Sequence, residues 1–415
     1  MPYIMTRLDK QLKLRAFEKK QAYIPIGSAM KAKRIANKWT LEEVCENICS
    51  VSYLSKLENN LVEMSDKFRD ELLKRLGLED YNFHVYERTD NDLSQCLDMI
   101  LEKKIDTSHL FESYKDKLDY QSGIILMTMS YMHGHLLEAS QKYDELLPYV
   151  SQFTDFEVSV FTYINGCVLY QQGFYEQALM MIKRSVYDMV DHKTLKLLSD
   201  KLKLALYFRL HRHTDLLYLY DKLFERLAKA HRYDDLKEIQ VEMLIYQTQR
   251  LSVADITNQL DHICQMDDST KNYILARSHY HHQQYEKVFQ LMSQHPFDTD
   301  RHTQLYLLTL DKLNQAPEII LRVSRGFQSE RFEDLQLKLY LTNKMKLSES
   351  MFAEYLKREY FNQALVVEDF FILNYLALDG QACLSKSHFY KDATKVMHHY
   401  VRTMHSLTGS GVPSY

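Results

Sequence analysis

The chain contains few residues that interrupt helices. Glycine occurs 10 times and proline 6 times among 415 residues, which is roughly a third of the share that soluble proteins normally carry. The interior prolines Pro25, Pro148, Pro296 and Pro317 fall where helices should begin or end. This scarcity excludes a fold rich in turns, and we expect an almost entirely helical protein.

Other features are missing as well. No run of about 18 apolar residues appears, so we expect no membrane span. The six cysteines come without an export signal, which favours a reducing, cytoplasmic compartment. The sequence has no glycine-rich phosphate loop, no Gly-x-Ser-x-Gly and no His-Glu-x-x-His. Its histidine clusters, such as His211 with His213, lack metal-site spacing and are expected on solvated helix faces. We therefore expect no enzyme, no metal and no cofactor.

What is present is a length and composition that indicate at least two domains. The chain is 46% hydrophobic, enough for a sizeable core. Charge is unevenly distributed: residues 1–79 carry 15 basic and 11 acidic side chains, and residues 1–38 alone carry 10 and 2. Because positive potential attracts phosphate, the amino-terminal part is the expected DNA-facing end, with affinity that depends on salt.

The most informative stretch is CSVSYLSKLENN, residues 49–60. Thr40, with Glu43 three residues later, forms a capping box that predicts a helix over 41–48. Ser50 can cap a second helix whose face Val51, Leu54 and Leu57 should pack inward. The opposite face carries short hydroxyls and one cation, which suit base edges and phosphates: Ser50, Ser52, Ser55 and Lys56. The alternative is an ordinary helical hairpin that is rich in serine.

The whole module reads as four helices over 26–36, 41–48, 51–59 and 65–76, closed by Gly77. It resembles the XRE or Cro/repressor type of helix-turn-helix, and ICSVSYLSKLEN most resembles the variant in the Rgg, PlcR and NprR peptide-sensing regulators. Trp39 and Asn60 depart from the common pattern, although Asn tolerates a left-handed turn. The resemblance implies that Arg34 pairs with Glu58. It also implies major-groove contacts from Ser50, Val51, Ser52, Ser55 and Lys56, and phosphate contacts from Thr40 and Asn59.

The first 25 residues lie outside this resemblance. They form a basic extension that either contacts the DNA backbone or is a solvated extension or leader. No apolar core of seven residues follows its charges, so no signal peptide is expected. Residues 80–92 are polar and predict a linker between the DNA-binding domain at 26–79 and the rest of the chain.

Residues 93–407 show an internal period. The clearest unit is FTYINGCVLYQQGFYEQALMMIKRSV, which predicts two helices joined at Gly173. The same layout recurs with turns at Gly134, Arg212 and Gln283, and more weakly near Gln249, Gln315 and His388. We expect a right-handed α-solenoid of about seven tetratricopeptide-like hairpins, followed by a flexible tail at 408–415.

Such a solenoid has a concave surface that suits a short peptide. The residue three positions before each turn should point into it, which gives Tyr131, Tyr170, Arg209, Tyr246, Tyr280 and Lys312. Aromatic rings supply contact area, and cations can take a peptide carboxylate. Further candidates on the same helices are Tyr163, Asn165, Gln247, Arg277 and Asn374. The alternative is that the tyrosines are half-buried solenoid surface.

The resemblance implies a homodimeric, quorum-sensing type regulator. In it, a short signalling peptide binds the repeats and alters how two DNA-binding domains read a palindromic or repeated operator. Two alternatives stay open: the repeats bind a partner protein, or they serve only as a dimerisation scaffold without a peptide ligand.

Overall fold

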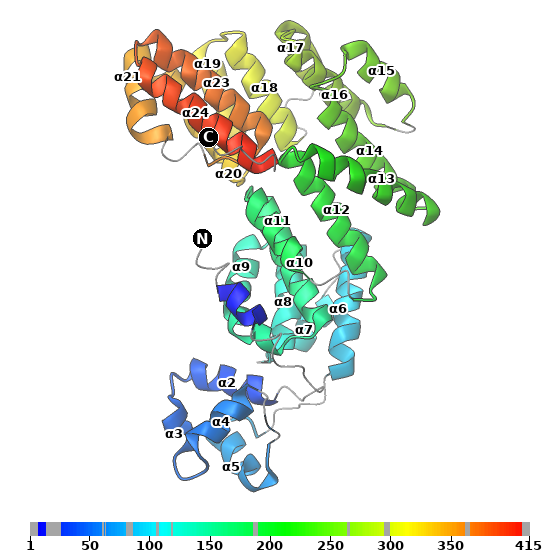
Figure 1. Ribbon diagram of the computed structural model, residues 1–415, viewed down its shortest axis with the longest axis vertical. Helices are drawn as coiled ribbons and strands as arrows, with labels where there is room; N and C mark the ends of the chain where they lie inside the picture. Colours follow the sequence, from blue (N-terminus) through cyan, green and yellow to red (C-terminus); the bar gives the residue numbers. More distant parts are fainter. Residues whose placement is uncertain are drawn as a thin grey trace. The chain divides into compact units, whose positions relative to one another are not determined.

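The computed structural model describes residues 7–13, 26–59, 62, 64–79, 86–104, 108–117, 119–185, 190–263, 266–293, 299–361 and 366–408. Over these ranges the protein is all-α, as predicted, and contains no strand (Figure 1). None of the helices in these ranges is long and apolar enough to cross a membrane. The chain divides into two compact units, which we describe separately: unit 1 is 1–168 with 180–199, and unit 2 is 169–179 with 200–415.

Unit 1 contains the four short helices expected between residues 26 and 77. Their side chains close a small core around Met30, Val44, Leu54, Leu57 and Leu72. Gly77 ends the last helix in the left-handed conformation (φ 64°), and the Leu78 N–H donates to Leu73 O at 2.8 Å. The helices are α2 (Ile26–Ala36), α3 (Leu41–Cys45), α4 (Val51–Glu58) and α5 (Asp66–Leu76).

The second of these helices is shorter than predicted. We expected it to continue to Ile48, but α3 ends at Cys45 and Asn47 adopts φ 63°. A left-handed residue cannot continue a right-handed helix, so residues 46–49 form the turn itself. Asn60, which departs from the family pattern, lies outside the described residues.

The amino-terminal extension is structured where it is described. Residues 7–13 are helical, and Leu8 is fully buried. Arg184 Nη2 donates to Asp9 Oδ2 at 2.9 Å, within unit 1. Over this stretch the expectation of a solvated extension is therefore wrong, and one of its charges is used inside the protein. Residues 1–6 and 14–25 lie outside the described residues.

The predicted linker is also partly wrong, because residues 86–92 already belong to a helix, and residues 80–85 lie outside the description. Two of the helices that follow run from one unit into the other. The elements are α6 (Tyr86–Leu101), α7 (Ser108–Tyr114), α8 (Tyr120–Met132), α9 (Leu136–Leu146), the 3-10 turn η1 (Leu147–Gln152), α10 (Asp155–Gln172) and α11 (Tyr175–Arg184).

In unit 2, helices that are consecutive in sequence pack against one another, as in repeat proteins (Figure 1). They are α12 (Lys193–Arg209), which begins in unit 1, α13 (His213–Lys229), α14 (Tyr233–Gln247), α15 (Val253–Asp261), α16 (Asp268–His281), α17 (Tyr285–Met292), α18 (Asp300–Lys312), α19 (Pro317–Gly326), α20 (Phe332–Lys346), α21 (Glu349–Tyr355), the π-turn η2 (Leu356–Tyr360), α23 (Phe370–Lys386) and α24 (Tyr390–Thr408).

One backbone turn recurs between helices in both units. A left-handed residue ends the first helix, and the next N–H donates to the carbonyl five residues back, which satisfies an otherwise unpaired helix-end carbonyl. Examples are Phe174 N to Leu169 O at 2.9 Å and Gln284 N to His279 O at 2.9 Å. The left-handed residues at these turns are Lys38, Gly77, Lys103, Gly134, Gly173, His211, His231, Gln283, Asn314 and His388.

Four of the predicted turns are therefore placed correctly, at Gly134, Gly173, Gln283 and His388. The turns predicted at Arg212 and Gln315 lie one residue earlier, at His211 and Asn314. The turn near Gln249 has no left-handed residue, and its chain runs through 248–252 from α14 to α15. The turn at His231 and the pair α20 and α21 were not predicted.

Candidate functional site

Helix α4 has one buried and one exposed face. The Ser50 side chain caps it, with the Tyr53 N–H donating to Ser50 Oγ at 3.2 Å. Leu54 and Leu57 are buried as expected, whereas Val51 is 36% exposed. The prediction that Val51 packs inward is thus wrong, because it occupies the first helical position, beyond the edge of the small core. Ser50, Ser52 and Lys56 are exposed, and Ser55 is half-buried.

The ion pair expected between α2 and α4 is present. Arg34 Nε donates to Glu58 Oε1 at 2.6 Å and Nη2 donates to Oε2 at 2.8 Å, a bidentate arrangement. The third nitrogen, Nη1, donates to the Trp39 carbonyl at 3.0 Å. The Glu58 side chain keeps only 3% of its exposure. Its hydrogen bond to Glu58 raises the pKa of Arg34 above its ordinary value, so this site fixes α4 through two fully paired charges.

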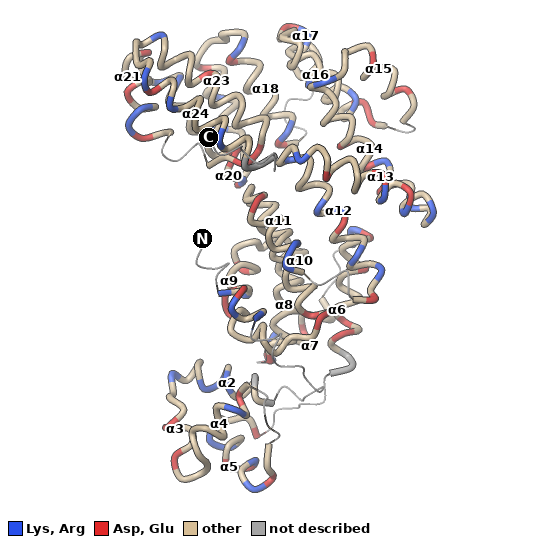
Figure 2. The backbone as a smooth tube through the Cα atoms, viewed as in Figure 1, with Lys and Arg blue, Asp and Glu red and all other residues tan. Residues whose placement is uncertain are grey.

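The two residues expected at phosphates are engaged within the protein. Thr40 caps α3: the Glu43 N–H donates to its Oγ1 at 3.2 Å, and Glu43 Oε2 accepts from the Thr40 N–H at 2.6 Å. Asn59 Nδ2 donates to Ser55 O at 2.8 Å, and Lys31 Nζ donates to Asn59 Oδ1 at 3.2 Å. Lys and Arg residues also mark α2, α4 and α5 in Figure 2. The DNA contacts of Thr40 and Asn59, like those of the α4 residues, stay predictions.

The expected peptide-binding residues are distributed over both units. Tyr131, Tyr163 and Asn165 belong to unit 1, and the others belong to unit 2. Tyr163 and Asn165 are only 4% and 6% exposed, and burial raises the pKa of Tyr163. Both side chains are therefore buried, and their contact with a peptide stays a prediction.

In unit 2 several of the candidates contact other protein side chains. Tyr170 packs edge-on against Tyr175 with ring centroids 5.4 Å apart, and Lys312 Nζ lies 3.4 Å from Asp379 Oδ1. Asn374 Oδ1 accepts from Tyr400 at 2.8 Å. Tyr280 packs on Phe371 at 5.5 Å. The Oε1 atom of Gln247 is buried and has no hydrogen-bond partner among the described residues.

Three of the candidates, Arg209, Tyr246 and Arg277, meet at one cavity in unit 2. Its volume is about 40 Å³. It is lined from the end of α12, from α14, α16 and α18, and from the start of α23. The lining residues are Phe208, Arg209, His211, Glu242, Ile245, Tyr246, Gln249, Arg277, Arg301, Asp369, Phe370 and Phe371.

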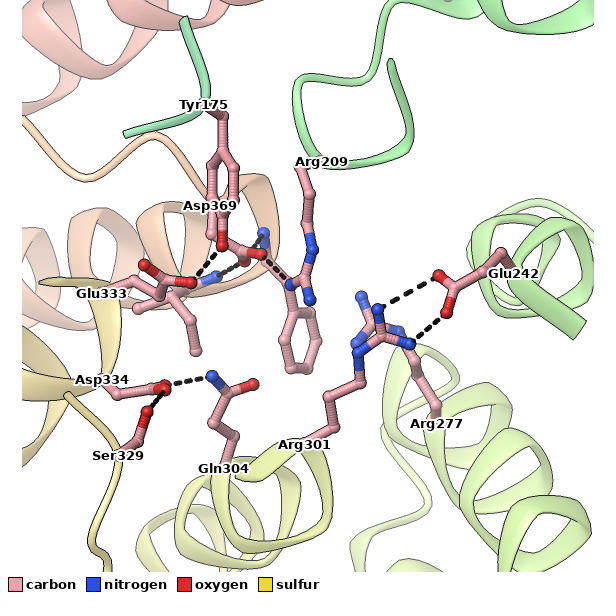
Figure 3. A network of polar contacts seen from close by, with 12 residues as sticks. Tyr175, Arg209, Glu242, Arg277, Arg301, Gln304, Ser329, Glu333, Asp334 and Asp369 are labelled. Atoms are coloured by element: carbon pink, nitrogen blue, oxygen red, sulfur yellow. Dashed lines mark hydrogen bonds and ion pairs between the residues drawn. The ribbon is translucent and has the colours of Figure 1, made fainter. Parts of the chain in front are cut away.

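Both carboxylates of this cavity are committed to ion pairs (Figure 3). Asp369 caps α23, accepting from the backbone N–H groups of Phe371 and Ile372 at 3.0 and 3.1 Å, and its other oxygen accepts from Arg209 Nη1 at 2.6 Å. Arg301 donates to both oxygens of Glu242, at 2.6 and 3.1 Å. Burial opposes ionisation of both acids, yet the facing guanidinium holds the pKa of each below its ordinary value.

A second group of carboxylates lies beside the cavity and forms no ion pair with any residue that the structure describes. Tyr175 donates its hydroxyl to Glu333, and Gln304 and Ser329 donate to Asp334 (Figure 3). Burial raises the pKa of Asp334 to about 7, and burial together with Asp369 raises that of Glu333. Burial thus favours the protonated forms, although the hydrogen bonds that these neutral partners donate act in the opposite direction.

Two histidines from the clusters expected on solvated faces are buried instead: His211 lines this cavity, and His281 packs on Phe371 of its lining. His211 stacks on Phe370 at 3.8 Å, and burial, with Arg277 and Arg250 contributing, lowers its pKa to about 3 against the opposing effect of Asp369. Burial and then Arg277 lower the pKa of His281 to about 3. Both rings are therefore neutral at physiological pH. Among the described residues no group of three His, Cys, Asp or Glu side chains could hold a metal ion.

Sequence reasoning missed Glu242, Arg301 and Asp369. Asp369 carries a local signal, because an acid before FFIL can cap a helix. The other two carry none, since their pairing joins α14 to α18 across 59 positions of sequence.

Few known proteins are similar to this chain. No family model matches the chain, and no curated protein matches it. The chain is similar to one solved structure, the crystal structure of Bacillus thuringiensis PlcR in complex with the peptide PapR7 and DNA, at 14% identity and a TM-score of 0.25. That match covers 78% of this chain and 100% of the PlcR chain. Likeness at this level does not establish a family and carries no argument about function.

Proposed function

We propose that the protein is a DNA-binding transcription regulator in which α4 reads the major groove and unit 2 takes a short peptide ligand. The observation that carries the DNA-binding part is the geometry of α4. Its inner face is anchored by Leu54, Leu57 and the Arg34–Glu58 pair, while Val51, Ser52 and Lys56 are exposed on a capped helix. A short helix held this firmly and carrying hydroxyls and a cation outward suits base edges and phosphates.

The peptide part is supported by the cavity in unit 2, where guanidinium groups and aromatic rings face the same space. The two other possibilities, a protein partner for unit 2 and a scaffold with no ligand, predict no response to peptide. We expect a homodimer reading a repeated or palindromic site, by analogy with helix-turn-helix proteins in general.

The test begins with selection of bound duplexes from a random DNA pool by the full-length protein, followed by affinity measurements at several salt concentrations. Lys56→Ala should weaken binding and reduce the slope of log affinity against log salt by about one. Lys74→Ala is the matched control, because it removes an equal charge from an exposed position on α5. No enrichment of any sequence, or equal effects of the two variants, would contradict the role of α4.

The peptide part is tested on the selected duplex. A pool of short hydrophobic peptides should change the affinity of the full-length protein for that DNA, because a ligand that prefers one of two domain arrangements shifts their populations. Sequence-specific DNA binding that no peptide alters would favour the scaffold alternative.

A further inference from the structure

The cavity of unit 2 contains more cationic donors than its own acids can use. It is lined by three guanidinium groups and two carboxylates. Each carboxylate already has one arginine, Asp369 with Arg209 and Glu242 with Arg301. Arg277 has no carboxylate partner among the described residues: its Nη1 donates to the Tyr273 hydroxyl at 3.0 Å, and its guanidinium lies 4.0 Å from the centroid of the Phe371 ring.

Several buried donor atoms around the cavity have no acceptor within the described part of the chain. They are Arg277 Nε, Arg209 Nη2 and Gln249 Nε2. A buried donor left unpaired costs roughly 1–3 kcal/mol, and more when it is charged. Three of them lining one cavity are hard to explain by packing alone. Figure 3 shows Arg209, Arg277 and Arg301 turned toward one another, so like charges also converge here.

The charge of Arg277 helps to lower the pKa values of Glu242 and Asp369, but no third ionised acid among the described residues at the cavity balances the third arginine. Glu333 lies beside the cavity without lining it and accepts from the Tyr175 hydroxyl. Burial and the neighbouring Asp369 raise its pKa, which favours its neutral form. The other titratable groups near Arg277 are His211, in the turn after α12, and His281, which lies four residues further along α16 itself. Both rings are neutral and cannot compensate the charge.

We propose that this cavity binds one carboxylate group, held by Arg277 Nε and Arg209 Nη2 with Gln249 as a third donor. Charge-assisted bonds from two arginines match the acceptors of a carboxylate. The volume of about 40 Å³ corresponds to a few water molecules, so the cavity admits the group itself and not a whole peptide. Phe208, Tyr246 and Phe370 give it an aromatic wall for an adjoining apolar side chain.

The source of the carboxylate that we favour is the free carboxyl terminus of a short apolar peptide, and in this respect the inference rests on the proposed function. An acidic side chain or a small free acid would offer the same chemistry. The site itself does not depend on which source supplies the group, and the experiment separates the two questions.

The first measurement uses ligand-free, full-length protein. Arg209→Gln should lower the melting temperature of unit 2 by several degrees, because Asp369 loses its cation. Arg277→Gln should leave that temperature unchanged or raise it, because it removes a charge that pairs with no acid. Arg325→Gln, at an exposed position on α19, is the control for loss of an arginine. Equal destabilisation by Arg277→Gln and Arg209→Gln would overturn the proposal, since Arg277 would then be structural.

The second measurement titrates acetate at constant ionic strength. Acetate should raise the melting temperature of the wild type more than that of Arg277→Gln, and this difference removes any general salt effect. No difference would overturn the carboxylate site. The third compares short apolar peptides with free carboxyl termini against the same peptides with terminal amides. The amides should bind roughly 10- to 100-fold more weakly, and this loss should shrink in Arg277→Gln.

The outcomes separate the two proposals. Acetate stabilisation without any peptide binding would support the carboxylate site and contradict the peptide part of the proposed function. Equal binding of acids and amides, with no acetate effect, would contradict the carboxylate site and leave peptide binding in place.

Discussion

Arg34 in unit 1 and Arg277 in unit 2 differ in how fully their donors are used. Arg34 places Nε and Nη2 on Glu58 and Nη1 on the Trp39 carbonyl, all within 3.0 Å. Arg277 has one hydrogen bond, to Tyr273, and a buried Nε with no acceptor among the described residues. A fully paired guanidinium stabilises its surroundings, whereas one with unused donors is poised to bind something else. We therefore interpret Arg34 as a structural arginine and propose Arg277 as a binding one.

The largest expected effect comes from charge reversal at Glu58, the partner of the fully hydrogen-bonded Arg34. Glu58→Lys would bury a second cation against Arg34, and we expect it to cost about 3–5 kcal/mol and to unfold the four-helix core of α2 to α5. Trp39 is the only tryptophan of the chain and packs on this core, so its fluorescence reports this region alone. Glu46→Lys makes the same charge change at an exposed position and should melt like the wild type. An unchanged melting temperature of Glu58→Lys would contradict a structural role of the Arg34–Glu58 pair.

The two units can also be compared at the same backbone turn. Gly134 in unit 1 and Gly173 in unit 2 have φ of 77° and 87°. An added methyl at Gly134 meets nothing within 4 Å, whereas at Gly173 it would collide with the Glu333 carboxylate and lie 3.2 Å from Phe332 N. Gly134→Ala should cost about 1–2 kcal/mol from backbone strain. Gly173→Ala should cost roughly 2–5 kcal/mol, because overpacking is added to that strain. Urea denaturation of both variants tests this ranking, and equal costs would contradict the contact with Glu333.

These turns show what the sequence can and cannot predict. Gly134 and Gly173 were found because glycine readily adopts positive φ. The turn at His231 has the same geometry (φ 53°) and the same bond, from Arg232 N to Leu227 O at 3.0 Å, but histidine gives no such signal. The capping box of Thr40 was predictable for the opposite reason, since its residues are three apart and their chemistry is local.

The cavity in unit 2 shows the same difference between residues that the sequence can predict and contacts that it cannot. Arg209 was predicted from its position three residues before a turn, although that turn was assigned one residue too late, and Arg277 was a further candidate on the first helix of another hairpin. Their grouping at one cavity depends on Asp369, 160 positions beyond Arg209. Which arginine has a carboxylate and which has not is a tertiary property, and no sequence spacing encodes it.

Asp334 is the opposite case to Arg277, because it is a buried carboxylate that forms no ion pair among the described residues. Asp334 is 1% exposed and accepts only from neutral donors, and burial raises its pKa from 3.8 to about 7. The folded protein therefore binds more protons than the unfolded chain between about pH 4 and 7, and this group makes stability fall as pH rises through that window. Asp334→Asn should remove this fall, gaining on the order of 2 kcal/mol relative to the wild type at pH 8. Urea melts at pH 5 and pH 8 measure it, and a variant with an unchanged pH slope would contradict the raised pKa.

The smallest expected effect is on His211, which responds to the charge of Arg277 without touching an acid of its own. Burial is the main reason that its pKa falls to about 3, and Arg277 adds to that fall. Because the unfolded ring titrates near 6.5, only the unfolded chain gains this proton between about pH 6.5 and 3, so His211 makes the fold less stable as pH drops through that range. Arg277→Gln should raise the His211 pKa by less than one unit, and a bound carboxylate should raise it in the wild type. Proton NMR titration of the ring, assigned with His211→Gln, measures both shifts. If neither change moves the resonance, the positive charge of Arg277 does not act in this cavity. The contrast drawn between Arg34 and Arg277 would then be contradicted at Arg277.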